Sequence, residues 1–198
     1  MKCVYHGVPG RMVGEVLYPL NQLAKVDSRS HELQRSKYEG RERLLQMSIP
    51  GLDLLWNDTL HCAPIHPHLL YEARRALDLL PSPWMTGRFF EIPLERILVN
   101  PVIWFSGGAP IRPAGGEDDH AASFGREFER FDAARYHELP EVPVAHLSYL
   151  RRMKDSGKRP LTFAYIPHVL VAGSIDVAGV RTIAWDEPAS TATALGDG

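Results

Sequence analysis

Three histidines lie close together in one apolar stretch of the chain, at His61, His66 and His68, with Asp58 and Cys62 beside them. A catalytic zinc site needs three ligands and an open coordination position. The spacing HxxxxHxH differs from the HExxH pattern, and no helix would bring these histidines onto one face. We therefore predict no metal site, and we interpret the stretch as a buried polar network or the lining of a cavity.

Cys62 is also a candidate nucleophile. A papain-like site or a hydrolase nucleophile elbow would need a recognisable turn such as GxSxG, which the sequence lacks. Because Cys62 lies within an apolar run, a buried and unreactive thiol is favoured. The phosphate-binding patterns GxGxxG and GxxxxGK[ST] are absent as well, so the common nucleotide-binding folds are not predicted.

Length and composition restrict the class of protein. The chain has 198 residues, of which 44% are hydrophobic, and this is enough for one domain with a sizeable core. A net charge of −2 gives no support for a nucleic-acid coat protein or a membrane-surface binder, although a local basic groove is compatible with it. Two cysteines predict buried thiols in a reducing compartment. No apolar run approaches the length of a membrane span, so we expect a soluble, cytoplasmic protein.

The elements that position these residues indicate an α+β fold. Sixteen prolines and sixteen glycines are typical of a loop-rich chain and argue against a helical bundle. The predicted strands cover residues 2–8, 88–92, 101–106 and two or three segments within 161–185.

The predicted helices alternate with these strands. They cover residues 28–47, with Ser30 as the N-cap and a break at Gly40, and then 68–80, 124–139 and 144–155. We expect a single domain over 1–185, a mobile loop over 107–122 and a disordered tail over 186–198.

The end of the first predicted strand, Tyr5-His6-Gly7, resembles the opening of the ADP-ribosyltransferase fold. In that superfamily this strand carries a histidine or an arginine that hydrogen-bonds NAD. The resemblance implies two small packed antiparallel sheets flanked by helices. It also assigns His6 to the ribose or the carboxamide of NAD, while Gly7 lets the ligand approach the backbone closely.

The order of the later elements is similar to the DarT-like (DUF4433) branch of this superfamily, which modifies DNA bases. The similarity is carried by the polar helix with Gly40-Arg41-Glu42-Arg43, then by an apolar strand and the stretch LHCAPIHPHLLY at 60–71, and finally by PHVLV at 167–171. It implies that Arg41 contacts a phosphate or orients the acceptor, for which a guanidinium is suited. A solvated surface charge is the alternative for Arg41.

The same resemblance implies roles for three further residues. Tyr38 would stack on the nicotinamide, and Asn57 and His61 would line the pocket. The alternatives are a core tyrosine on a helix face and a satisfied polar network in the core.

The chain departs from the family pattern at the catalytic carboxylate, because His168 stands where the glutamate is expected. ADP-ribosyl transfer passes through an oxocarbenium-like state, which a carboxylate usually stabilises. Glu127, Glu129 or Glu138 could replace it, and His168 could itself act as a base near neutral pH. The predicted catalytic residues are therefore Arg41, His168 and Glu127.

The resemblance implies an enzyme that uses NAD as a substrate, cleaves the nicotinamide glycosidic bond and transfers ADP-ribose to a nucleobase, a protein, a small molecule or water. The alternative is a catalytically silent nucleotide- or protein-binding module on the same fold, which the unmatched glutamate favours. The near-neutral charge argues mildly against a long nucleic-acid acceptor, because phosphate contacts need basic residues.

Overall fold

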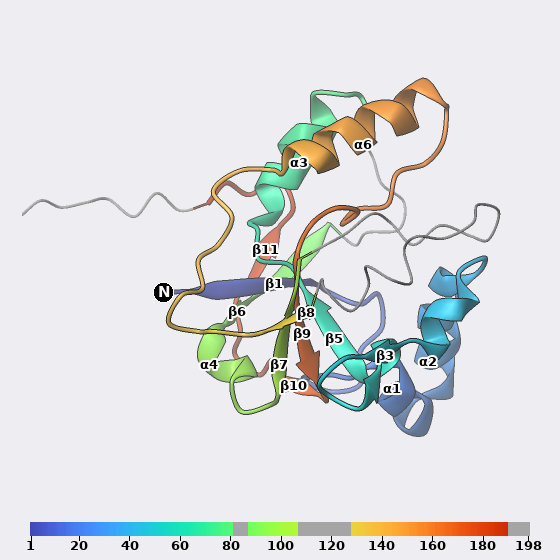
Figure 1. Ribbon diagram of the computed structural model, residues 1–198, viewed down its shortest axis with the longest axis vertical. Coiled ribbons are helices and arrows are strands. Elements are labelled where there is room, and N and C mark those ends of the chain that lie inside the picture. Colours follow the sequence, from blue (N-terminus) through green and yellow to red (C-terminus); the bar gives the residue numbers. More distant parts are fainter. Residues whose placement is uncertain (81–86, 107–127, 190–198) are drawn as a thin grey trace, which may run out of the picture.

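The computed structural model describes residues 1–80, 87–106 and 128–189, in which short helices combine with small antiparallel sheets (Figure 1). The predicted α+β class is therefore confirmed. The predicted loop over 107–122, the predicted catalytic residue Glu127 and residues 190–198 of the predicted tail lie outside the described residues. Within the described ranges, no helix is both long and apolar enough to cross a membrane.

The strands are short, and all the strand pairs between them are antiparallel. They are β1 (Cys3–Gly7), β2 (Val16–Leu17), β3 (Ser48–Ile49), β4 (Leu54–Leu55), β5 (Thr59–Cys62), β6 (Arg88–Pro93), β7 (Val102–Phe105), β8 (Phe128–Arg130), β9 (His168–Ala172), β10 (Ile175–Asp176) and β11 (Thr182–Ala184).

The helices lie around these sheets, with α3 and α6 together at one end of the molecule and α1 and α2 at the other (Figure 1). They are α1 (Leu20–Val26), α2 (Ser28–Arg35), α3 (Pro67–Arg75), α4 (Leu94–Ile97) and α6 (Val144–Asp155), with the 3₁₀ helices η1 (Ser36–Tyr38), η2 (Glu42–Gln46) and η3 (Trp56–Asp58).

Two sheets form the centre of the molecule. One has the strand order β1-β6-β11, and the other has the order β5-β9-β7-β8. A bridge joins them, in which the amides of Tyr5 and Ala63 each donate a hydrogen bond to the other residue's carbonyl, with N···O distances of 2.9 and 2.8 Å. The bridge fixes the end of β1, and therefore His6, next to the end of β5.

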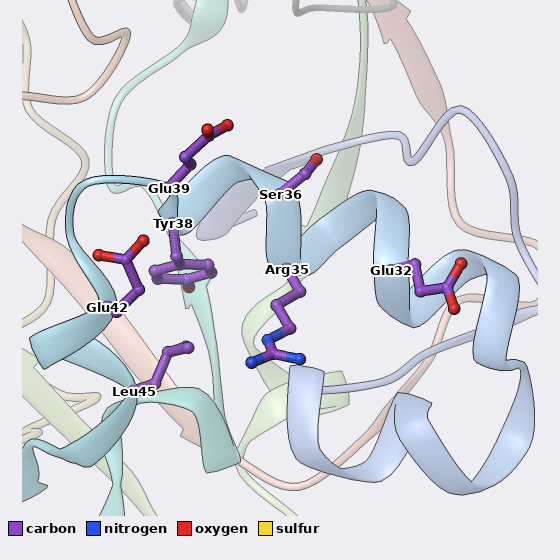
Figure 2. Close-up of a pocket in the computed structure, with 7 residues that line it drawn as sticks. All are labelled: Glu32, Arg35, Ser36, Tyr38, Glu39, Glu42 and Leu45. Atoms are coloured by element: carbon purple, nitrogen blue, oxygen red, sulfur yellow. The ribbon is translucent and has the colours of Figure 1, made fainter.

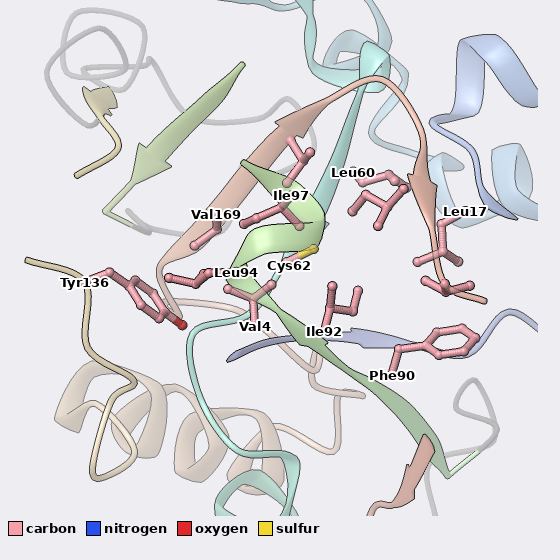
Figure 3. Packing of buried hydrophobic residues seen from close by; sticks show 13 residues of the cluster. Val4, Leu17, Leu60, Cys62, Phe90, Ile92, Leu94, Ile97, Tyr136 and Val169 are labelled. Carbon is pink, nitrogen blue, oxygen red and sulfur yellow. The ribbon is translucent and has the colours of Figure 1, made fainter. Parts of the chain in front are cut away.

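The main core fills the space between the two sheets (Figure 3). Val4 and Ile92 from the first sheet pack in the same cluster as Leu60, Cys62 and Val169 from the second, and the exposed fraction of each side chain is 6% or less. Burial of apolar surface from both sheets is the main stabilising contribution here. The two cysteines are free and buried, as predicted, and burial raises the pKa of Cys62 to about 12.

The helix predicted over residues 28–47, with a break at Gly40, is observed in part, because α2 ends at Arg35 and two 3₁₀ helices follow it. Gly40 has a positive φ of 73° and makes the turn between η1 and η2, so the predicted break at this glycine is confirmed. The N-cap is Asp27 and not Ser30: Asp27 accepts hydrogen bonds from the Arg29 amide at 3.2 Å and from the Ser30 hydroxyl at 2.6 Å.

The helix predicted over 124–139 is also wrong from residue 128 onward, where β8 pairs with β7. Phe128 lies opposite Phe105, and the two rings pack with centroids 4.9 Å apart. This cross-strand contact and the ladder of backbone hydrogen bonds outweigh the helix propensity of the Arg- and Glu-rich sequence. By contrast, the helix predicted over 144–155 is confirmed as α6.

Candidate functional site

Three histidines from three strands come together beside the bridge between the sheets. His6 ends β1, His61 lies in β5 and His168 begins β9. The rings of His61 and His168 have centroids 6.1 Å apart, and His6 is close enough to influence the ionisation of His61. We call these residues the histidine cluster. The structure thus brings together three residues that the sequence had marked as candidates.

Burial keeps the histidine cluster neutral at pH 7. It lowers the pKa of His6 to about 4, that of His61 to about 3 and that of His168 to about 4. Mutual repulsion adds to the effect at His61, since His168 and His6 both lower its pKa further. The cluster therefore offers hydrogen-bonding imidazoles and not positive charges.

Each of the first two imidazoles uses one ring nitrogen to bind the backbone. Nδ1 of His6 lies 2.8 Å from the Gly7 carbonyl oxygen, and Nε2 of His61 lies 3.1 Å from the Trp56 carbonyl oxygen. A neutral ring that donates through one nitrogen has an acceptor on the other. His168 is different, because its buried Nδ1 has no partner in hydrogen-bond geometry, while the Ile166 backbone hydrogen-bonds this imidazole and opposes the lowering of its pKa. An orphaned buried nitrogen of this kind is suited to a ligand.

Aromatic side chains surround the cluster. Trp56 packs edge-on against His61 with ring centroids 4.3 Å apart, and Phe105 and Phe163 lie 6.2 and 6.1 Å from His168. We call Tyr38, Trp56, Phe105 and Phe163 the aromatic wall. Aromatic faces of this type stack on flat rings and attract cationic ones.

Tyr38 and Arg41 lie at the outer end of this wall. The Trp56 side chain hydrogen-bonds the Tyr38 hydroxyl, and burial raises the pKa of Tyr38 although Arg41 and this hydrogen bond oppose the shift. Arg41 precedes η2, with its guanidinium carbon 5.8 Å from the centre of the Tyr38 ring and a hydrogen bond to the Lys37 carbonyl. Lys37 also lowers the pKa of His6, so cationic groups lie on this side of the cluster.

Gly7 and Asn57 have other surroundings. Gly7 pairs with Phe89 in β6, and a Cβ atom at this position would lie 3.9 Å from the Phe89 ring, which is ordinary contact. Asn57 binds Asn21 with an N···O distance of 2.5 Å, and Asn21 in turn binds Asp58 at 2.6 Å. This network attaches α1 to η3 and occupies the Asn57 amide nitrogen, although its amide oxygen is buried without a partner.

Two of the carboxylates proposed to replace the missing glutamate lie away from the cluster. Glu138 accepts hydrogen bonds from the Cys3 amide at 3.0 Å and from the Tyr5 hydroxyl at 2.8 Å. Glu129 is opposite Trp104 in the ladder between β8 and β7, whereas Phe128 and His168 are both opposite Phe105. Since successive strand residues point to opposite faces, Glu129 is on the face away from His168.

Replacing Glu138 with alanine is expected to destabilise the protein by about 2–3 kcal/mol, because the buried Tyr5 hydroxyl and the Cys3 amide both lose their partner. The midpoint of urea unfolding would measure the effect. Glu141→Ala, at an exposed position nearby, is the matched control. A loss equal to that of the control would show that Glu138 does not hold β1 in place.

In the part of the chain that the structure describes, no group of three or more histidine, cysteine, aspartate or glutamate side chains is arranged to hold a metal ion. His66 and His68, the other histidines of the HxxxxHxH pattern, are at the start of α3. Nδ1 of His66 accepts a hydrogen bond from the His68 amide at 3.3 Å, which caps this helix.

Two surface pockets lie outside the histidine cluster. A pocket of about 300 Å³ is lined by Tyr38, Arg35 and Glu42, among others, and the Tyr38 ring lies between the Glu42 and Arg35 side chains (Figure 2). A second pocket, of about 670 Å³, is lined by residues of β7 and β8 and by the turn at residues 50–52. Neither pocket is lined by His6, His61 or His168.

Sequence reasoning did not find the aromatic wall beyond Tyr38. Trp56, Phe105 and Phe163 are apolar residues in apolar stretches, and nothing in their spacing distinguishes them from core residues. The one available signal in the sequence was that Trp56 is only five positions before His61. Comparison with known proteins gave no match to a family model, to a curated protein or to a solved structure.

Proposed function

We propose that the chain is an ADP-ribosyltransferase-like enzyme that binds NAD at the histidine cluster and cleaves the bond between nicotinamide and ribose. The observation that supports this proposal is the convergence of His6, His61 and His168 on an aromatic wall, with a buried Nδ1 of His168 left without a partner. The proposal takes the role of His6 from the resemblance to the ADP-ribosyltransferase superfamily, and it gives His168 the place of the glutamate that the chain lacks at this position.

The surroundings are suited to a cationic nicotinamide ring. Tyr38 and Trp56 would stack on the ring, because aromatic faces attract cations most strongly where water is excluded. His6 would hydrogen-bond the ribose or the carboxamide through its free ring nitrogen. Arg41 and Lys37 would bind the diphosphate, to which a guanidinium can donate two parallel hydrogen bonds.

In the proposed reaction, the bond between ribose C1′ and the nicotinamide nitrogen breaks, and its electron pair leaves with the now neutral nicotinamide. An acceptor atom then forms the new bond to C1′ and gives its proton to Nδ1 of His168. An imidazole with a pKa near 4 is a weak base. It suffices for an acceptor that has begun to bond to a strongly electrophilic carbon, because this bonding acidifies the proton.

A catalytically silent nucleotide-binding module on the same fold is the second candidate. The observation that favours it concerns the carboxylates: among the described residues, none contributes to the pKa of His6, His61 or His168. An oxocarbenium-like state would then lack the usual anionic stabilisation within the described part of the site.

Release of nicotinamide from NAD by the purified protein tests the proposal. We expect His168→Ala to lower the rate about 10²- to 10⁴-fold, the usual contribution of a positioned acid–base group. His6→Ala and Arg41→Ala are expected to weaken NAD binding. His137→Ala, at an exposed position far from the cluster in sequence, is the matched control and should keep full activity.

The two candidates give different results in this experiment. An NAD-dependent rise in melting temperature that requires His6, without nicotinamide release, would identify the binding module. If NAD gives neither turnover nor a thermal shift, both uses of NAD are excluded.

A further inference from the structure

The layer formed by α3 and α6 contains a buried cation, Arg74, whose side chain is only 2% exposed. One guanidinium nitrogen donates to the Pro160 carbonyl at 3.1 Å, and Nε has no partner. None of the ion pairs among the described residues includes Arg74. A buried charge without a counter-charge is strongly unfavourable, so this position favours an anion.

Two neighbouring side chains also have unused polar atoms. The Trp185 ring centroid is 5.9 Å from the Arg74 guanidinium carbon, and its buried Nε1 has no hydrogen-bond partner. His146 is fully buried. Its Nδ1 lies 2.6 Å from the Ala164 carbonyl, and its Nε2 is unpartnered. Burial lowers the pKa of His146, and Arg74 is near enough to lower it further.

These three groups define the ligand they would bind. Nε of Arg74 and Nε1 of Trp185 are donors, whereas Nδ1 of neutral His146 donates to a carbonyl and leaves Nε2 as an acceptor. The complementary ligand is an oxyanion that accepts two hydrogen bonds and donates one. Phosphate carries a P–OH group at neutral pH and can donate through it, whereas sulfate cannot.

The surface beside Arg74 is rich in positive charge although the chain as a whole is not. Residues 151–159 contain five basic side chains and one acidic side chain, and all six are exposed. One of them, Arg159, is close enough to Arg74 to affect its ionisation. A basic surface of this kind raises the local concentration of anions and would guide them toward the buried guanidinium.

We propose that the chain binds a phosphate ion between α3 and α6, with Arg74 as the counter-charge, Trp185 as a second donor and His146 as the acceptor of the phosphate hydroxyl proton. This site involves none of the residues of the histidine cluster or the aromatic wall. It is therefore independent of the proposed function, and the two can be tested separately.

Titration of the full chain with inorganic phosphate at constant ionic strength tests this site, with chloride and sulfate as comparison anions. We expect a saturable rise in melting temperature and a saturable change in the fluorescence of Trp185, with phosphate at least about tenfold tighter than sulfate. An ordered water only, in place of the anion, predicts no saturable effect of phosphate and would overturn the proposal.

Variants locate the effect. Arg74→Met removes the charge and keeps the length, and we expect it to abolish the phosphate response. Its matched control is Arg75→Met, at the adjacent exposed position, where the guanidinium pairs with Glu72. Trp185→Phe keeps the ring and removes the N–H donor, so it should weaken phosphate binding about tenfold.

The two main variants also provide a check on folding. Where Arg74→Met does not fold, the dependence of the Trp185→Phe melting temperature on phosphate concentration still decides the question. An unchanged phosphate affinity in Trp185→Phe, or a response lost equally in Arg75→Met, would contradict the site.

Discussion

Lowering the pH from 7 to 5 is expected to destabilise the protein by several kcal/mol. His6, His61 and His168 have pKa values near 4, 3 and 4 in the folded state, whereas an unfolded histidine has a pKa near 6.5. Above pH 6.5 both states are neutral and stability does not depend on these groups. Below it the unfolded state binds protons that the folded state does not bind, so stability falls until the pH reaches the folded pKa.

The size of the loss in stability follows from the number of protons that the unfolded state binds and the folded state does not bind. Each histidine that stays neutral contributes about 1.4 kcal/mol per pH unit, and three together approach about 4 kcal/mol per pH unit. Burial lowers the pKa of His66 and His146 as well, which adds to the slope. A domain near the lower end of the usual range of about 5–15 kcal/mol would lose all of its stability between pH 6.5 and about pH 5, and we expect acid unfolding in this window.

Urea unfolding followed between pH 5 and 8 measures the slope. His61→Asn should reduce this slope by about 1.4 kcal/mol per pH unit, which is the contribution of one proton. The control is His137→Asn, which removes an exposed histidine outside the cluster. A free energy of unfolding that does not change between pH 5 and 7 would show that the cluster is hydrated and not desolvated.

Replacing Leu170 with alanine is expected to cost about 3–4 kcal/mol of stability. Leu170 is fully buried in the middle of β9, where it packs in the cluster formed with Leu44, Ile49, Trp56 and Phe105. The variant loses the transfer free energy of the removed atoms and leaves a cavity that a β-sheet cannot close by moving one strand. The measurement is the urea midpoint at pH 7.5.

Leu33→Ala is the matched control for Leu170. Leu33 is 55% exposed on α2, and alanine favours a helix at least as strongly as leucine, so we expect a change within about 0.5 kcal/mol. Similar losses in the two variants would mean that the side of β9 facing Trp56 is not packed as described.

The residue pattern along the chain predicted several elements correctly. The spacing of apolar residues over 144–155 predicts α6 with the observed bounds, and the apolar runs over 88–92 and 101–106 predict β6 and β7. Burial of both cysteines followed from the apolar residues around them. In these segments the residue pattern and the tertiary contacts favour the same structure.

Prediction failed where a distant partner decides the structure. Residues 128–130 have a helix-forming composition, and only the pairing of Phe128 with Phe105 makes them a strand. The interruption after Arg35 likewise follows from packing of Leu44 and Tyr38 against Trp56 and not from any helix breaker before Gly40. Contacts of this kind depend on register, which a single sequence does not reveal.

The candidate site shows the same division. His6, His61 and His168 were each identified by resemblance, but their meeting depends on the bridge between Tyr5 and Ala63 and on the pairing of β5 with β9. The same resemblance assigned Asn57 to the pocket, but the amide nitrogen of Asn57 donates a hydrogen bond to Asn21 and not to a residue of the histidine cluster. A polar residue in an apolar run thus indicates a required partner without saying which one.

The bridge between Tyr5 and Ala63 also has a consequence for how the protein matures. His6 emerges early in synthesis, but β9, which supplies His168 and pairs with β5, is complete only at Ala172. A nascent chain therefore holds β1 and β5 without their final neighbours during most of translation. Contacts between residues so far apart in sequence form slowly. The histidine cluster is accordingly among the last parts of the molecule to assemble, and a chain interrupted before residue 168 cannot form it.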